Sequence, residues 1–191
     1  LDLPYETRSV SIVRNENREP AFMKLNPFAQ IPVLVDGTRV VTDSQAIIAY
    51  LARAYGGDEA ERWMPVEPAA LAVVMRWLSV AGNEIQNSVT MARAIKLLGW
   101  PLDYKLAVDR SYRVLGLMDN HLAERKWLAA DHATVADIAC YPYLLLAAEG
   151  GIDTAPYPVV CAWLRRVESL PHFWPMPRIP NLPPVPLAPR P

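Results

Sequence analysis

The 191-residue sequence has only two cysteines and three histidines. Cys140 and Cys161 form neither a Cys-x-x-Cys pair nor a metal-ligand spacing. The histidines are scattered at His121, His132 and His172, so they build neither a triad nor a metal cluster. Both cysteines are flanked by apolar residues, which is typical of buried, reduced thiols in a cytoplasmic protein. We therefore expect a cytoplasmic protein without a metal site.

A strong charge of either sign is absent as well. The formal net charge is −1 at pH 7, which gives no electrostatic footprint for nucleic acid or for an anionic membrane. No apolar run is long enough to span a bilayer, and 144–148 is predicted to be a short core segment. With 52% hydrophobic residues, the chain can bury the core of one or two domains. We expect no nucleic-acid or membrane partner.

The most informative stretch present is 26–52, which predicts a strand, a tight turn, a second strand and a helix. Ile31–Val35 is a short apolar run, Asp36-Gly37 is a strong hairpin signal, and Arg39–Thr42 contains the β-branched residues of a return strand. Apolar residues then recur at helical spacing at Ile47, Ile48, Leu51 and Ala52. The helix is therefore expected to begin at Asp43 or Ser44.

This helix start has the chemistry of an anion site. A helix N-terminus offers unpaired N–H groups and a positive dipole end, to which Ser44 adds a hydroxyl group. With the Asp43 carboxylate beside it, the pair suits a zwitterionic amino-acid head. The simpler interpretation is that Asp43-Ser44 only caps the helix, which is the commonest role of such residues. Likewise, Pro32 could be only a strand boundary and Gln30 only a solvated loop residue.

The compound pattern Asn-Pro-x-x-Gln-Ile-Pro-Val-Leu followed by Asp-Ser-x-Ala-Ile resembles the glutathione-binding half of the glutathione transferases, which has a thioredoxin-like fold. The resemblance implies that glutathione is the co-substrate and that Asp43 and Ser44 hold its γ-glutamyl end. It also implies a cis Ile31–Pro32 bond, with the Ile31 amide and carbonyl pairing with the cysteinyl backbone of the tripeptide. Gln30 would then lie near the glycyl end.

The same resemblance implies a segment that this sequence lacks. Leu1–Glu6 is similar to the end of the family's first helix and the entry to its second strand, which we expect at Thr7–Val13. The preceding strand and most of the helix, roughly 20 residues, are therefore expected in a longer natural chain. In the family this unit holds the Tyr, Ser or Cys that activates the glutathione thiol. The catalytic residue is thus unknown, and no residue of this sequence is assigned that role.

The remaining sequence predicts a second, all-helical domain. We expect a thioredoxin-like domain over 1–56, a linker over 57–68, an all-helical domain over 69–175 and a proline-rich extended tail over 176–191. The tail either binds a partner or lies over its own or a neighbouring subunit. In the first long helix, Ser79, Asn83 and Asn87 form a polar stripe that either lines an electrophile pocket or faces solvent or a subunit. Trp77 and Met91 fit a pocket wall or the core equally well.

A capping box at Thr134-x-x-Asp137 marks the start of a later helix, and Pro142 inside that helix is expected to kink it. This box is similar to one in the transferase family, and the segment 157–173 resembles the family's last common helix. The sequence is thus expected to belong to a glutathione transferase of the bacterial cytosolic type. Its expected reaction is attack of the glutathione thiolate on a hydrophobic electrophile, in detoxification and as a homodimer. The alternatives are a non-catalytic binding or assembly module and a glutathione-dependent isomerase, dehalogenase, ether-cleaving enzyme or disulfide reductase on the same fold.

Overall fold

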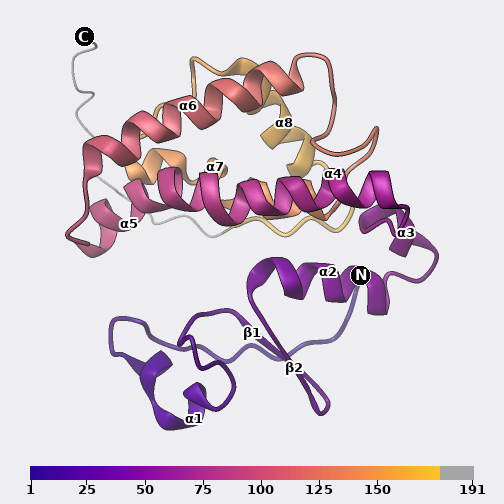
Figure 1. Ribbon diagram of the computed structural model, residues 1–191, viewed down its shortest axis with the longest axis vertical. Helices are drawn as coiled ribbons and strands as arrows, with labels where there is room; N and C mark the ends of the chain where they lie inside the picture. Colours follow the sequence, from indigo (N-terminus) through magenta and orange to yellow (C-terminus); the bar gives the residue numbers. More distant parts are fainter. Residues whose placement is uncertain (177–191) are drawn as a thin grey trace. The chain divides into compact units, whose positions relative to one another are not determined.

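The computed structural model describes residues 1–176, and its chain divides into two compact units at Pro65 and Val66. The first unit combines a small sheet with short helices, and the described part of the second contains helices alone (Figure 1). A small α/β domain followed by an all-helical domain is the order expected from the sequence. The tail predicted at 176–191 lies outside the described residues apart from Met176.

The sheet of the first unit is one β-hairpin. Strand β1 (Val33–Asp36) pairs antiparallel with β2 (Arg39–Thr42), so that Val33 lies opposite Thr42 and Asp36 opposite Arg39. Gly37 has a φ of 58° in the intervening turn, a conformation that favours glycine. The predicted hairpin is therefore confirmed, with its turn at the expected Asp-Gly pair.

The prediction of a strand at Thr7–Val13 is wrong. No residue of this segment pairs with another strand, because β1 and β2 pair only with each other among residues 1–176. Local bonds hold the end of the segment in turns instead: the Ser11 amide donates to the Glu16 carboxylate at 2.6 Å, and the Glu16 amide donates to the Ser11 carbonyl at 3.0 Å. A β-strand needs a neighbouring strand to pair its backbone N–H and C=O groups, and the sequence of a segment alone does not provide that neighbour.

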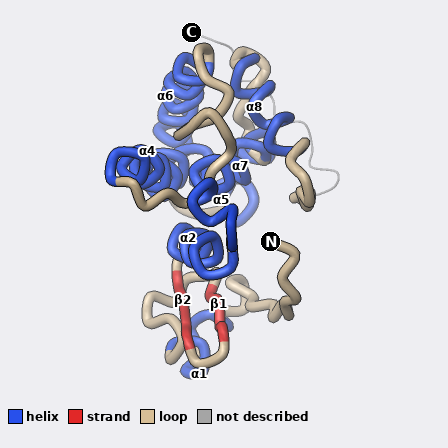
Figure 2. Tube along the Cα trace, turned by 90° about the vertical axis from the view of Figure 1, so that its right-hand side faces the viewer, coloured by secondary structure: helices blue, strands red, loops and turns tan. Residues whose placement is uncertain are grey.

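Helix α2 (Ser44–Tyr55) packs against the hairpin, as the tube view shows (Figure 2). It begins at Ser44 with Asp43 as its N-cap, as the sequence predicted. The stretch predicted as a linker contains two short helices, of which α3 contacts α2. The other elements of this unit are η1 (Glu16–Arg18), α1 (Pro20–Met23), η2 (Gly57–Glu59) and α3 (Ala60–Trp63).

A shared carboxylate ties α2 to the turn of the hairpin. The Tyr50 hydroxyl donates to Oδ2 of Asp36 at 2.5 Å, and the Tyr55 hydroxyl donates to the same oxygen. Arg39 completes the cluster by donating to the Tyr50 hydroxyl at 2.9 Å. These bonds fix the second half of α2 to one end of the hairpin and so hold the helix in register with the strands.

The second unit opens with one continuous helical segment over 68–98. It runs through α4 (Pro68–Ser79), the π-helix η3 (Val80–Thr90) and α5 (Met91–Leu98) without a break. A π-helix of this length is unusual, since most occur as single-turn bulges, often at functional sites. The segment lies beside α6 (Tyr104–Leu122), and η3 forms most of that contact (Figure 1).

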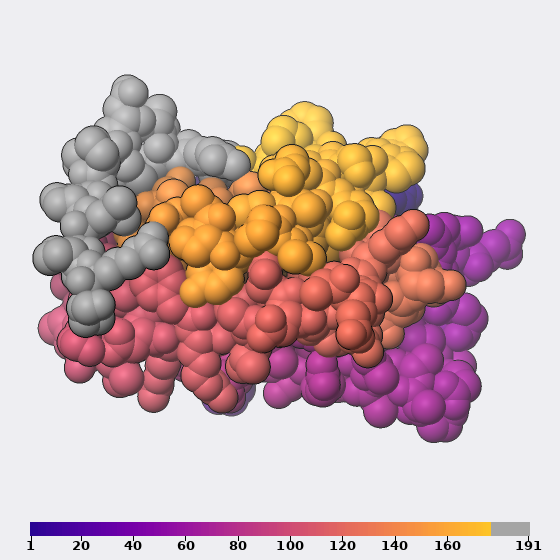
Figure 3. Space-filling model, turned by 90° about the horizontal axis from the view of Figure 1, so that it is seen from above, coloured from indigo at the N-terminus to yellow at the C-terminus, as the bar shows by residue number. Residues whose placement is uncertain are grey.

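The core of this unit lies between the α4–η3–α5 segment and three further helices. Helix α7 (Val135–Leu145) contacts α4 and η3, and α8 (Pro158–Glu168) contacts both α6 and α7. In the space-filling view the orange-to-yellow surface of α7 and α8 adjoins the red surface of α6 (Figure 3). The 3-10 helix η4 (Ala147–Gly150) packs on α5. Fully buried core residues include Val74, Ile85, Leu115, Met118, Leu144 and Trp163.

The predicted capping box at α7 is confirmed, and it extends into a buried network. Asp137 is fully buried, and its Oδ2 accepts a hydrogen bond from the Thr134 amide at 3.0 Å. Its Oδ1 accepts from the Leu128 amide at 3.0 Å and from the Trp163 indole at 2.9 Å. One carboxylate therefore joins the loop before α7, the start of α7 and α8. Helix α7 continues through Pro142 to Leu145.

Both cysteines are free thiols. Cys140 is fully buried, its Sγ donates to the Trp77 carbonyl at 3.6 Å, and burial raises the pKa of its thiol. Cys161 is partly buried. Within residues 1–176, no group of three or more His, Cys, Asp or Glu residues is arranged to hold a metal ion.

Measured against the length and hydropathy that a bilayer requires, no single helix of the described part of the chain qualifies as a membrane span. Two helical segments separated by a sharp bend, Gly57–Trp63 and Pro68–Leu98, meet the length and hydropathy requirements when they are taken together, by length and composition only.

Replacing Asp137 by alanine should destabilise the helical unit severely. Three buried donors would lose their acceptor, and each unsatisfied donor costs about 1–3 kcal/mol. We expect the free energy of unfolding to fall by about 3 kcal/mol or more, measured by urea denaturation with tryptophan fluorescence. Asp109→Ala, which removes an exposed carboxylate paired with Lys105, is the control and should cost much less. Equal losses in the two variants would contradict the network.

The tyrosine pair makes the first unit sensitive to alkaline pH. The hydrogen bond to Asp36 raises the pKa of Tyr55 from 10.0 to about 12. A raised pKa stabilises the fold below the unfolded value, and this contribution is lost as the pH rises through the folded one. The thermal unfolding midpoint, followed by circular dichroism, should therefore fall more between about pH 10 and 12 in the natural sequence than in Tyr55→Phe. If the unfolding midpoint fell equally with pH in both proteins, the hydrogen bond between Tyr55 and Asp36 would not contribute to stability.

Candidate functional site

Two asparagines shape the loop that leads into β1. Asn26 is buried, with 2% of its surface exposed, and its Nδ2 donates to the Gln30 carbonyl at 2.8 Å. Its Oδ1 accepts from the Phe28 amide at 3.1 Å, which closes an Asx turn. Asn17, from η1, donates to the Ala29 carbonyl at 2.7 Å. The loop thus has a defined path up to Ile31, and the Gln30 side chain remains exposed.

Ile31 presents an unpaired backbone at the end of this loop. The Ile31–Pro32 peptide bond is cis, and β1 begins one residue later at Val33. Among residues 1–176, neither the N–H nor the C=O of Ile31 makes a hydrogen bond, and the residue is 44% exposed. A donor and an acceptor on one exposed residue can pair with an extended peptide, as in strand addition.

The start of α2 supplies the polar part of the site. Oδ1 of Asp43 accepts from the Gln45 amide at 2.9 Å and from the Ala46 amide at 3.1 Å, so the capping interpretation of Asp43 is confirmed. Ser44 is exposed, and its hydroxyl contacts the Gln45 side-chain amide at 3.1 Å. The Ser44 N–H has no acceptor among the described residues. A free amide and a hydroxyl therefore face solvent at the positive end of α2.

Capping alone does not account for the backbone of Asp43. Its φ of 75° and ψ of 132° lie outside the regions that non-glycine residues favour. The other helix caps of the described residues whose side chains accept amides have ordinary φ values, −59° at Glu67, −72° at Asp103 and −130° at Thr134. A conformation of this kind costs about 1–3 kcal/mol and is concentrated at functional sites. Asp43 thus has a strained geometry that a cap does not require.

The hairpin register brings these groups to one place. Because Val33 lies opposite Thr42, the residue before β1 and the residue after β2 are at the same end of the ladder. Ile31-Pro32 and Asp43-Ser44 therefore lie together at the end remote from the Asp36-Gly37 turn. The arrangement offers backbone donors and acceptors for a peptide, with a helix N-terminus for its carboxylate.

Sequence reasoning missed the two asparagines. Asn26 had a signal, because Asn-Pro is a common turn start, whereas Asn17 acts across 12 residues and had none. Of the residues considered in the helical domain, Ser79, Asn83 and Asn87 are all exposed, and Asn87 donates to the Asn83 carbonyl at 3.0 Å. Trp77 is 4% exposed and belongs to the core.

Comparisons with known proteins show which family the chain resembles. Sequence models of the glutathione S-transferase N-terminal and C-terminal domains match residues 1–54 and 102–171. Glutathione S-transferase D7 of Anopheles gambiae is 33% identical over 170 residues, which cover 88% of this chain and 77% of that protein.

Two solved structures are also similar. A glutathione S-transferase from Pseudomonas fluorescens matches with a TM-score of 0.82 and 33% identity, over 91% of this chain and 86% of that one. A glutathione transferase homologue from Drosophila mojavensis, solved with bound glutathione, matches with a TM-score of 0.78 and 27% identity, over 89% and 78%.

These matches extend over both units, the first with the hairpin and α2 and the second with helices alone. The expected fold class, a thioredoxin-like domain followed by an all-helical transferase domain, is confirmed. The chain belongs to the glutathione S-transferase family.

Proposed function

We propose that this protein binds glutathione through Gln30, Ile31, Pro32, Asp43 and Ser44. The observation that carries the proposal is the hairpin register, which sets the unpaired backbone of Ile31 beside the start of α2. The homologue from Drosophila mojavensis was solved with bound glutathione, which supports the choice of ligand.

Each part of the tripeptide has a matching group. The Ser44 N–H and hydroxyl bind the γ-glutamyl carboxylate, and the Asp43 carboxylate attracts its ammonium group. The N–H and C=O of Ile31 pair with the cysteinyl backbone in the manner of a one-residue strand addition. The exposed Gln30 side chain lies towards the glycyl end. In this proposal Asp43 has two roles, since it also caps α2 through Oδ1.

The proposed reaction is the transfer of glutathione to an electrophilic small molecule, as the family name indicates. The thiolate sulfur of bound glutathione attacks an electrophilic carbon of a hydrophobic small molecule, a C–S bond forms, and the leaving group departs with its electron pair. We assign no residue of this chain the role of lowering the thiol pKa. We also propose, from family membership, a cytoplasmic homodimer that acts in detoxification.

Ser44→Ala and Asp43→Asn test the glutathione site without removing the helix cap. Asparagine caps helices as well as aspartate does and tolerates a positive φ, so Asp43→Asn removes the charge and leaves the cap. Hydrogen bonds to charged groups contribute about 1.5–3 kcal/mol, so each variant should bind glutathione about tenfold more weakly or worse. Isothermal titration calorimetry on the 191-residue chain gives the dissociation constants.

The matched controls are Asp58→Asn and Ser9→Ala, which make the same changes at exposed positions of the first unit. They should bind glutathione as the natural sequence does, and all five proteins should share one thermal unfolding midpoint within a few degrees. Unchanged affinity in both site variants would remove the site assignment. No binding of glutathione by the natural sequence would favour a non-catalytic module.

A further inference from the structure

The turn between β1 and β2 contains the one Asp-Gly pair of the sequence, Asp36-Gly37. In such a pair the glycine amide nitrogen can attack the aspartate side chain, because glycine has no Cβ to hinder the approach. Gly37 is exposed, and its N–H has no acceptor among the described residues. Apart from its chain neighbours, no atom lies within 4 Å of the position that a Cβ would occupy. The nucleophile and the space for a succinimide ring are therefore both present.

Two tyrosines of α2 hold the other reactant, the Asp36 carboxylate. The Tyr50 hydroxyl donates to its Oδ2 at 2.5 Å, and the Tyr55 hydroxyl donates to the same oxygen. The bond from Tyr50, followed by that from Tyr55, lowers the pKa of Asp36. A protonated carboxyl releases water when a nitrogen attacks it, whereas a carboxylate would have to release oxide, so the charged form is the less reactive one. The tyrosines thus restrain both the direction and the charge of Asp36.

The hairpin alone is a weak restraint on this residue. Among residues 1–176, β1 and β2 pair only with each other, and an isolated two-stranded hairpin is at best marginally stable in water. Asp36 pairs with Arg39 at the end of the ladder, where opening costs least. Arg39 itself donates to the Tyr50 hydroxyl at 2.9 Å. The hydrogen bonds that fix the side chains of this last pair therefore all involve α2.

We propose that Asp36-Gly37 is a site of spontaneous isomerisation to isoaspartate, and that Tyr50 and Tyr55 keep it in the unreacted state. The Gly37 nitrogen attacks Cγ of the protonated Asp36 carboxyl and a C–N bond forms. The carboxyl hydroxyl leaves as water with the amide proton, which gives a succinimide. A water molecule then opens the ring: attack at Cγ restores aspartate, and attack at the main-chain carbonyl carbon gives isoaspartate. The reaction requires no reagent besides water.

Isomerisation would remove the restraint that had delayed it. The main chain then runs through Cγ of residue 36, which adds one carbon between its Cα and Gly37. The carboxylate that remains is attached to Cα, so it is drawn back by one carbon from the hydroxyls of Tyr50 and Tyr55. The last pair of the ladder loses its geometry as well. The converted chain should unfold at a lower temperature, and none of these steps depends on the proposed binding of glutathione.

The test compares rates of isoaspartate formation at position 36. The natural sequence, Tyr55→Phe and Tyr50→Phe/Tyr55→Phe are kept at mildly acidic pH and body temperature, and samples are digested at intervals. Mass spectrometry with electron-transfer dissociation distinguishes isoaspartate from aspartate in the peptides. Because hydrogen bonds to charged groups are among the stronger ones, the double variant should convert about tenfold faster than the natural sequence or more. Tyr55→Phe should have an intermediate rate, and it is the variant to rely on if circular dichroism shows that the double variant does not fold.

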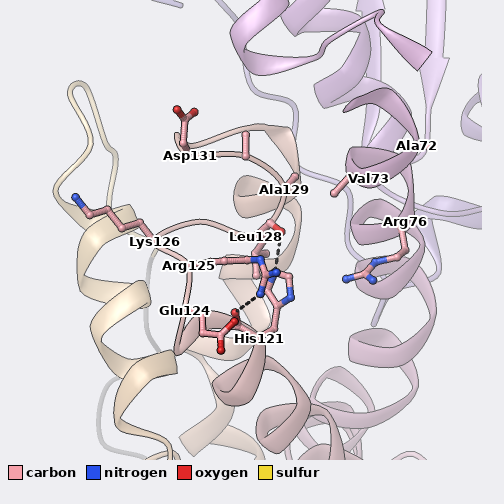
Figure 4. A pocket seen from close by; sticks show the side chains of 11 residues that line it. Ala72, Val73, Arg76, His121, Glu124, Arg125, Lys126, Leu128, Ala129 and Asp131 are labelled. Atoms are coloured by element: carbon pink, nitrogen blue, oxygen red, sulfur yellow. Dashed lines mark hydrogen bonds between the residues drawn. The ribbon is translucent and has the colours of Figure 1, made fainter. Parts of the chain in front are cut away.

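Two controls separate this effect from a general loosening of the chain. Tyr5→Phe removes the hydroxyl of an exposed tyrosine in the same unit and should convert as the natural sequence does. Asp131-His132 gives an internal reference in every digest, because Asp131 is exposed and its side chain points away from the other side chains drawn in Figure 4. Its rate should be the same in all the proteins. A synthetic peptide of residues 33–42, which lacks α2, gives the upper limit of the rate at position 36.

The proposal is supported if the rate at position 36 decreases from the peptide to the double variant, to Tyr55→Phe and to the natural sequence, with Asp131 unchanged. Equal rates in the natural sequence, the tyrosine variants and Tyr5→Phe would overturn the role of Tyr50 and Tyr55. Conversion of the natural sequence as fast as the peptide would overturn it too. If the double variant formed no isoaspartate at position 36 in the time that the peptide needs to convert, Asp36-Gly37 would not be a modification site.

Discussion

The pairing of β1 with β2 is the constraint on which the candidate glutathione site depends. A shift of one residue in that register would separate Ile31 from the start of α2 and turn every strand side chain to the other face. The Asp36 carboxylate opposes such a shift, because Tyr50 and Tyr55 of α2 donate hydrogen bonds to it. The other end of α2 begins at Ser44. A cluster at one end of the hairpin thus positions the chemistry at the opposite end.

The helical unit depends on a different kind of interaction. Asp137 is a buried carboxylate whose oxygens accept from two backbone amides and an indole. Such a group contributes specificity as well as stability, since few alternative packings could satisfy it. The loop that ends at Thr134 contains Leu128, whose amide is bound by Asp137 and whose carbonyl is bound by His121. The loop between α6 and α7 is therefore anchored to the core.

The parts of the fold that the sequence predicted are those determined by neighbouring residues. The Asp36-Gly37 turn, the helix start at Ser44 and the Thr134–Asp137 box all rest on contacts within a few positions, where turn and capping preferences are strong. The strand at Thr7–Val13 failed because a strand is defined by its partner. No composition rule marks the π-helical stretch in Val80–Thr90, because it differs from an α-helix only in which carbonyl each amide selects.

The sites divide along the same line. Ser44 and Pro32 stand in a motif that could be recognised, whereas the pairing of Asn17 with Ala29 and the strain at Asp43 are products of tertiary structure. Asn17 and Ala29 lie 12 positions apart, and neither has a distinctive local sequence. Long-range polar contacts of this kind escape prediction because any asparagine in a loop has the same local pattern.

The burial of Cys140 gives the helical unit a reporter of its own dynamics. A thiol that is enclosed by the core and kept protonated by its surroundings reacts with an alkylating reagent only while the core around it is open. The alkylation rate of Cys140 therefore equals the open fraction of the unit multiplied by the reactivity of an ordinary thiol. One native side chain, between Trp77 and Asp137, makes the breathing of the whole helical core accessible to mass spectrometry.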